Sequence, residues 1–149
     1  MLNNIAPFEK LLDLRTNEKD VALKAYQHSV DKFESVAMEL YSLLKEKEEI
    51  QEDLEHRLEV TIPVQDIHHY QHYLAKLDER IESLQRHVQA ARSNMEHKQE
   101  DLSESFIEMK KFEKVVELKK KANQKTIAKM ENNSLDEVSI QQYLRNRKR

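Results

Sequence analysis

Apolar residues recur at every third and then every fourth position along two long stretches of this chain. From Phe8 to Arg57, ten of fifteen such positions are apolar, and from Ile67 to Val116 thirteen of fifteen are. A seven-residue repeat sustained over this length indicates helices wound around each other in a left-handed supercoil, rather than helices buried in a globular core. The repeat therefore predicts two coiled-coil helices.

The composition supports long helices. The chain has 149 residues, no glycine, two prolines and 36% charged residues, so it has few residues for tight turns and many good helix formers. So polar a chain could instead be disordered, but the apolar repeat favours the coiled coil. Cysteine, a signal peptide and an apolar run of about 18 residues are all missing, so we expect a cytoplasmic location without membrane insertion.

The segment EVTIPVQ separates the two repeats. Pro63 suits the first turn of a helix, where its missing N–H needs no partner, and it disfavours a helical Ile62. A connection of about four to six residues makes the two helices antiparallel neighbours. The predicted fold is therefore all-α, a long two-helix antiparallel coiled-coil hairpin that places the N-terminus beside residues near 115–120.

The expected hairpin covers residues 1–131, with helices over about 8–58 and 64–131 and a turn over about 59–63. The sequence NNS at 132–134 suggests a break, and the SLDE sequence from Ser134 to Glu137 has the form of a capping box. Residues 132–149 are therefore predicted to form a short capped helix and a basic tail.

Several positions on the apolar seam are polar. Such residues cost stability but fix register and strand number, which is the interpretation we favour; the alternative is that some of them touch a partner. They are Arg15, Lys19, Ser29, Lys47, Lys98 and Ser105.

Three histidines follow the turn: His68, His69 and His72. Their spacing invites a metal-site reading, yet in the heptad register all three point away from the seam. A working metal site needs further ligands and shelter from water, which a bare hairpin does not supply. No phosphate-binding loop or catalytic triad can be argued either, so we expect no metal, no cofactor and no enzymatic activity.

Some apolar residues occupy outward heptad positions. Toward the end of the hairpin away from the turn they are Leu11, Leu14, Val21, Val115, Leu118 and Ala122, and along the shaft they are Met38 and Tyr41, with Tyr73 beside the seam. Exposed apolar patches mark partner sites. The alternative is that the terminal helices cover each other and that the shaft residues are ordinary exposed side chains.

Charge is unevenly distributed along the chain. Residues 110–149 carry 12 Lys or Arg against 5 Asp or Glu and end in RNRKR, whereas residues 1–109 carry 13 against 23. Such asymmetry marks either an interaction arm or a solvated helix end. A nucleic-acid-binding coiled coil using this basic arm is the alternative function, although the arm lacks interleaved aromatic residues.

Three short motifs resemble the flagellar export protein family FliJ. The N-terminal FEKLLDLRTNEK, the YQHYLAKL sequence after the turn and the later KKFEK sequence occur in the order and spacing of that family, and the resemblance covers nearly the whole chain. The likeness is greatest to Bacillus-type members. It implies a stalk or adaptor of the flagellar type III export apparatus, similar to the central stalk of rotary ATPases.

The resemblance also implies the partners. They are the export ATPase ring, whose assembly and activity the family promotes, the membrane export gate protein, and export chaperones. It implies a peripheral location at the cytoplasmic face of the membrane, at the flagellar base, with no nucleic acid bound.

Two sets of candidate site residues follow from the resemblance and the outward positions together. The open-end set, expected to dock on the ATPase, is Phe8, Leu11, Leu12, Leu14, Arg15, Glu18, Val21, Val115 and Leu118. The shaft set, expected to face the export gate, is Met38, Tyr41, Tyr70, Gln71, Tyr73 and Leu77.

Overall fold

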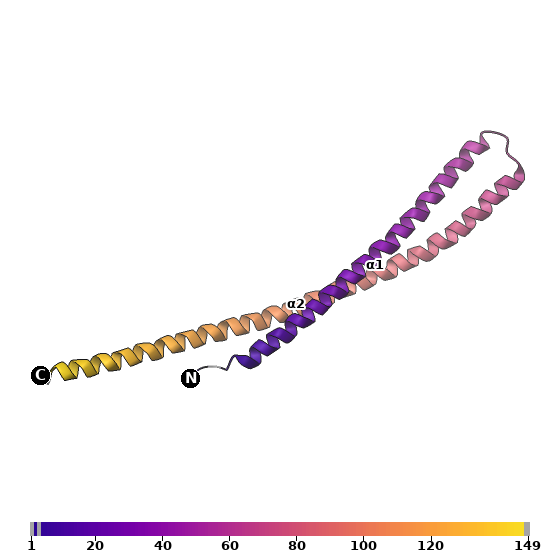
Figure 1. Cartoon of the computed structure of the whole chain (residues 1–149). Coiled ribbons are helices and arrows are strands. Elements are labelled where there is room, and N and C mark those ends of the chain that lie inside the picture. Colours follow the sequence, from indigo (N-terminus) through magenta and orange to yellow (C-terminus); the bar gives the residue numbers. More distant parts are fainter. Residues whose placement is uncertain (1, 3, 148–149) are drawn as a thin grey trace. The chain divides into compact units, whose positions relative to one another are not determined.

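The computed structural model describes residue 2 and residues 4–147. These form two helices, α1 (Ala6–Leu58) and α2 (Val64–Arg147), joined by residues 59–63 (Figure 1). Contacts divide the chain into two units. Unit 1 joins α1 up to Val21 with α2 from Ser103, and unit 2 is Ala22–Leu102. In each unit the two helices pack against each other in opposite directions, which confirms the predicted all-α antiparallel hairpin.

The predicted apolar seam is the buried side of both helices. Every seam position from Phe8 to Leu54 and from Ile67 to Val116 is buried or partly buried. In unit 2, Leu43, Leu77 and Ile81 form the core cluster, and in unit 1 the buried apolar side chains include Met109 and Val116. The heptad register is therefore confirmed along both helices.

Two polar seam residues of unit 2 have partners within that unit. The hydroxyl of Ser29, a side chain only 3% exposed, donates to the carbonyl oxygen of Tyr26 at 2.6 Å. Lys47 reaches across to Asp78, with 2.7 Å between Nζ and Oδ1. The Lys47–Asp78 ion pair joins the two helices, which fits the interpretation that polar seam residues fix the register.

The turn is built without glycine. Val60 N–H donates to the carbonyl of Arg57 after α1 ends, and the Pro63 carbonyl accepts from the N–H groups of Asp66 and Ile67 as α2 begins. No residue that the structure describes has a positive φ. Pro63 thus directly precedes the helix, where its missing N–H costs no hydrogen bond.

The short C-terminal helix is not present as a separate element. Instead α2 continues through Asn132, Asn133 and Ser134 to Arg147. None of these three residues is a helix breaker of the Pro or Gly kind, and each costs less than about 0.7 kcal/mol relative to alanine in a helix. Ending the helix there would replace intrahelical hydrogen bonds of the last carbonyl groups by bonds to water, because a capping box satisfies only the N–H groups of the next helix.

Residues 127–147 are all exposed, so this part of α2 has no covering from α1. The proposed division of the chain into a hairpin of 1–131 and a tail of 132–149 stays a prediction. The last two residues of the RNRKR tail lie outside the described residues. Among those described, no helix is both long enough and apolar enough to cross a bilayer.

Candidate functional site

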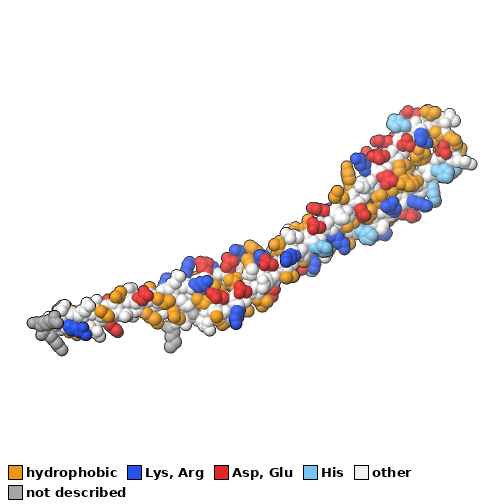
Figure 2. Space-filling view, viewed as in Figure 1, with side chains coloured by type: hydrophobic (Ala, Val, Ile, Leu, Met, Phe, Trp, Pro, Cys, Tyr) orange, Lys and Arg blue, Asp and Glu red, His pale blue; other side chains and the backbone are white. Residues whose placement is uncertain are grey.

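The histidines lie on the surface. All seven are exposed, as the heptad register predicts, and pale blue histidine side chains are visible on the outside in Figure 2. Within the described part of the chain, no group of three or more His, Cys, Asp or Glu side chains could hold a metal ion.

Four members of the open-end set lie on or beside the seam of unit 1: Phe8, Leu12, Arg15 and Val115 are each partly buried. Here two positively charged side chains reach from one helix to an aromatic ring of the other. Lys119 Nζ lies 4.3 Å from the centroid of the Phe8 ring, and the Arg15 guanidinium lies 5.5 Å from that of Phe112. Cations over aromatic faces stabilise such contacts modestly, so these residues hold α1 against α2.

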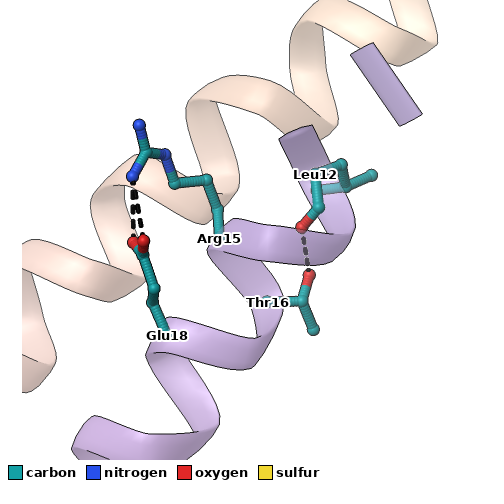
Figure 3. A network of polar contacts seen from close by, with 4 residues as sticks. All are labelled: Leu12, Arg15, Thr16 and Glu18. Atoms are coloured by element: carbon teal, nitrogen blue, oxygen red, sulfur yellow. Dashed lines mark hydrogen bonds and ion pairs between the residues drawn. The ribbon is translucent and has the colours of Figure 1, made fainter. Parts of the chain in front are cut away.

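Arg15 is held in place by its own helix. Its Nη1 donates to both carboxylate oxygens of Glu18, at 2.9 and 3.2 Å, while Thr16 donates to the carbonyl of Leu12 at 2.8 Å (Figure 3). The Arg15 Nε is buried without a hydrogen-bond partner. The side chain is thus committed to the seam, and its neighbour Glu18 carries the exposed charge.

The other members of the open-end set face water. Leu14 is 49% exposed, Val21 68% and Leu118 54%, and Leu11 is also exposed. With 3.6 residues per turn, Leu11, Leu14, Glu18 and Val21 fall on one face of α1, about 80° wide. Unit 1 therefore presents a row of uncovered apolar side chains with one carboxylate among them.

The shaft set lies in unit 2 and, like the open-end set, has exposed members and members packed on the seam. Met38 and Tyr41 are about as exposed as any apolar side chain of α1, at 70% and 67%, and Gln71 is exposed on α2. Leu77, by contrast, is 2% exposed in the core. Leu77 is not accessible to a partner in this arrangement, and its contribution is to pack the two helices together.

Both tyrosines after the turn bond across to α1. Tyr70 Oη donates to Asp53 Oδ2 at 2.6 Å, and Tyr73 Oη donates to a carboxylate oxygen of Glu46. Each hydrogen bond to a carboxylate raises the pKa of its tyrosine above the usual value, because it stabilises the protonated phenol. These bonds orient both rings at the edge of the seam.

Two open grooves lie next to the shaft set. One, of about 420 Å³, is lined by Tyr70 and Tyr73 together with Ile50 and Lys76. The other, of about 610 Å³, is lined by Met38 and includes Ser42 and Arg80. The shaft therefore offers shallow, mostly apolar grooves beside exposed aromatic and methionine side chains.

Sequence reasoning did not find Glu46 and Asp53, the acceptors of the two tyrosines. Both occupy g positions, the positions that flank a coiled-coil seam. Pairing g positions across the predicted hairpin could have found Glu46, the partner of Tyr73, but not Asp53, because its partner Tyr70 is a seam residue. It also did not single out Phe106 and Ile107, which are exposed on α2 in unit 1.

An antiparallel helical hairpin with uncovered apolar rows has a surface suited to binding other proteins. Comparisons with known proteins identify the family. The model of the family described as flagellar FliJ protein matches residues 4–148. The chain belongs to the FliJ family.

A curated relative supports this assignment. The flagellar FliJ protein of Bacillus subtilis strain 168 is 40% identical over 137 residues, which is 92% of this chain and 93% of the relative. No solved structure matches the chain. As a member of this family, the protein is a component of the flagellar export apparatus. It therefore takes part in protein transport and motility.

Proposed function

We propose that this protein is a non-enzymatic stalk of the flagellar type III export apparatus, and that its open-end set docks into the ring of the export ATPase and promotes ring assembly and activity. Its shaft set would face the membrane export gate. The chain would then be cytoplasmic and peripheral to the membrane at the flagellar base. Membership of the FliJ family supports the setting.

The observation that carries the ATPase proposal is the exposed row on unit 1. Leu14, Val21 and Leu118 expose about half or more of their surface, although apolar side chains in a folded hairpin gain by burial. A ring that closes around this end would cover them. The seam contacts of Phe8 and Arg15 would keep the two helices together as they enter it.

The direct test is reconstitution with the ATPase. We expect the purified chain to co-elute with the hexameric export ATPase in gel filtration and to raise its rate of ATP hydrolysis, because a stalk that bridges subunits favours the assembled ring. A chain that neither co-elutes nor changes the hydrolysis rate over a concentration series would contradict the proposal.

The shaft proposal has a separate test. Replacing Met38 and Tyr41 by alanine should weaken binding to the cytoplasmic domain of the export gate protein about tenfold or more, because exposed aromatic and methionine anchors dominate many interfaces. Binding would be measured by calorimetry. The control is Leu14→Ala with Leu118→Ala, which removes exposed apolar side chains from unit 1 instead and should leave gate binding unchanged.

If the affinity for the export gate protein fell equally in both double variants, the proposal that the shaft set binds the gate would be wrong. Unchanged affinity in the Met38 and Tyr41 variant would show the same. Helix content, followed by circular dichroism, should be equal in all chains because the four positions are exposed.

A further inference from the structure

One side of α2 in unit 1 carries a row of lysines. With 3.6 residues per turn, six of them fall within about 100° of the helix circumference. We call these six the lysine stripe: Lys110, Lys111, Lys114, Lys121, Lys125 and Lys129. All six are exposed.

Two other lysines of the same segment point elsewhere. Lys119 lies over the ring of Phe8, and Lys120 forms an ion pair with Glu9, with 3.6 Å between Nζ and Oε1. The lysines that face α1 thus serve the hairpin. The lysine stripe faces away from α1 and has no such role.

Carboxylates only partly balance the stripe. Glu108 and Glu113 pair with its first two members, and Glu117 pairs with Lys114 and Lys121. Between Glu117 and Glu131 the sequence of α2 contains no Asp or Glu at all. Lys125 and Lys129 therefore lie in a segment of α2 that contains no acidic residue.

Two exposed apolar side chains share this side of α2, one just before the lysine stripe and one within it. Ile107 is 52% exposed and Leu118 is 54% exposed, and both fall in the same sector of the helix as the stripe. The solvent-facing side of a helix is usually formed by polar and charged residues. A row of basic residues beside exposed apolar side chains is complementary to the surface of a membrane, where anionic headgroups cover an apolar interior.

We propose that the lysine stripe lies along the surface of an anionic phospholipid bilayer, with Leu118 and Ile107 entering the headgroup region. Lysines near such a surface gain from its negative potential, and their long aliphatic stems let the charge stay in water while the helix approaches. A straight row fits a plane, whereas a nucleic-acid duplex offers phosphates along a curved groove and no place for Leu118.

This inference goes beyond the proposed stalk function and does not depend on it. Leu118 belongs to both surfaces, since it is also a member of the open-end set. The same helix end therefore meets either the bilayer or the ATPase ring, but not both at once. Lipid binding would hold the free chain at the membrane before it enters the ring.

The test uses the full chain and vesicles alone. At 150 mM salt we expect co-flotation with vesicles of phosphatidylglycerol and phosphatidylcholine, and none with phosphatidylcholine alone. Lys121→Gln, Lys125→Gln and Lys129→Gln together should weaken vesicle binding on the order of a hundredfold, since each lysine near the surface contributes about fivefold. The control Lys24→Gln, Lys32→Gln and Lys45→Gln makes the same charge change on exposed residues of α1 and should retain binding.

Leu118→Ser separates lipid from other polyanions. It should weaken vesicle binding several-fold and leave the anisotropy of a labelled 20-base-pair duplex unchanged. Absence of vesicle binding by the natural chain, equal loss in the α1 control, or tighter binding to the duplex than to vesicles at the same salt would each overturn the proposal. So would normal vesicle binding by the Leu118 variant.

Discussion

A chain carrying Leu14→Asp and Leu118→Asp should keep its helix content but lose stimulation of the export ATPase. Both side chains are exposed, so the free chain loses no core contact. Docking would bury them, and burying an unpaired carboxylate costs roughly 3 kcal/mol or more, which is over a hundredfold in affinity. Hydrolysis rate at saturating ATP and ellipticity at 222 nm are the two measurements.

The matched control is Met38→Asp, because Met38 is an exposed apolar residue within α1 that lies outside the open-end set. It should stimulate the ATPase as the natural chain does. Full stimulation by the Leu14 and Leu118 double variant would refute the docking surface. Equal loss in the Met38 variant would show that a new charge anywhere on the helices suffices.

The second large effect concerns stability. Leu77→Ala should lower the free energy of unfolding by about 2–5 kcal/mol, because Leu77 is a fully buried side chain of the cluster with Leu43 and Ile81 and its removal leaves a cavity. Two long helices packed along a single seam have no second layer that could collapse into that space. Urea unfolding followed by circular dichroism measures the change.

Leu135→Ala provides the comparison for that measurement. Leu135 lies in the same helix and is 64% exposed, so the same substitution there should change the unfolding free energy by less than about 0.5 kcal/mol. A loss below about 1 kcal/mol for Leu77→Ala would mean that Leu77 does not lie in the core and is free to contact a partner.

Much of the fold could be predicted from the sequence because the heptad repeat is a local and periodic property. The repeat located the seam through Leu43, Leu77 and Val116, and even through polar members such as Ser29. Pro63 and the interrupted repeat around it located the turn. In a two-helix hairpin each helix buries one continuous apolar stripe. The position of a residue around the helix therefore decides whether its side chain is buried.

The candidate sites could be predicted less completely. Outward heptad phase identified Leu14, Val21 and Leu118 as exposed, and the structure agrees. The motif that includes Leu77 could not show that this residue is buried, because a motif gives sequence order and not accessibility. Whether the open-end and shaft sets bind the ATPase and the gate stays a prediction.

The C-terminal part shows where local signals mislead. The SLDE sequence has the form of a helix start, yet α2 passes through it without a break. Starting a new helix requires ending the previous one, and the residues NNS are only weak helix formers rather than breakers.

The sequence by itself determined that the chain forms two helices, where they turn, and which face of each is apolar. The short turn also placed the N-terminus near residues 115–120, as the contacts of Phe8 and Glu9 confirm, but only the tertiary structure decided which individual side chains meet across the seam. It brought Tyr70 to Asp53 and Lys119 to Phe8. It also turned Lys119 and Lys120 toward α1 and left the lysine stripe outside. Helix phase and turn length are local properties that set the seam and the approximate stagger, whereas each individual pair depends on packing between side chains far apart in the sequence.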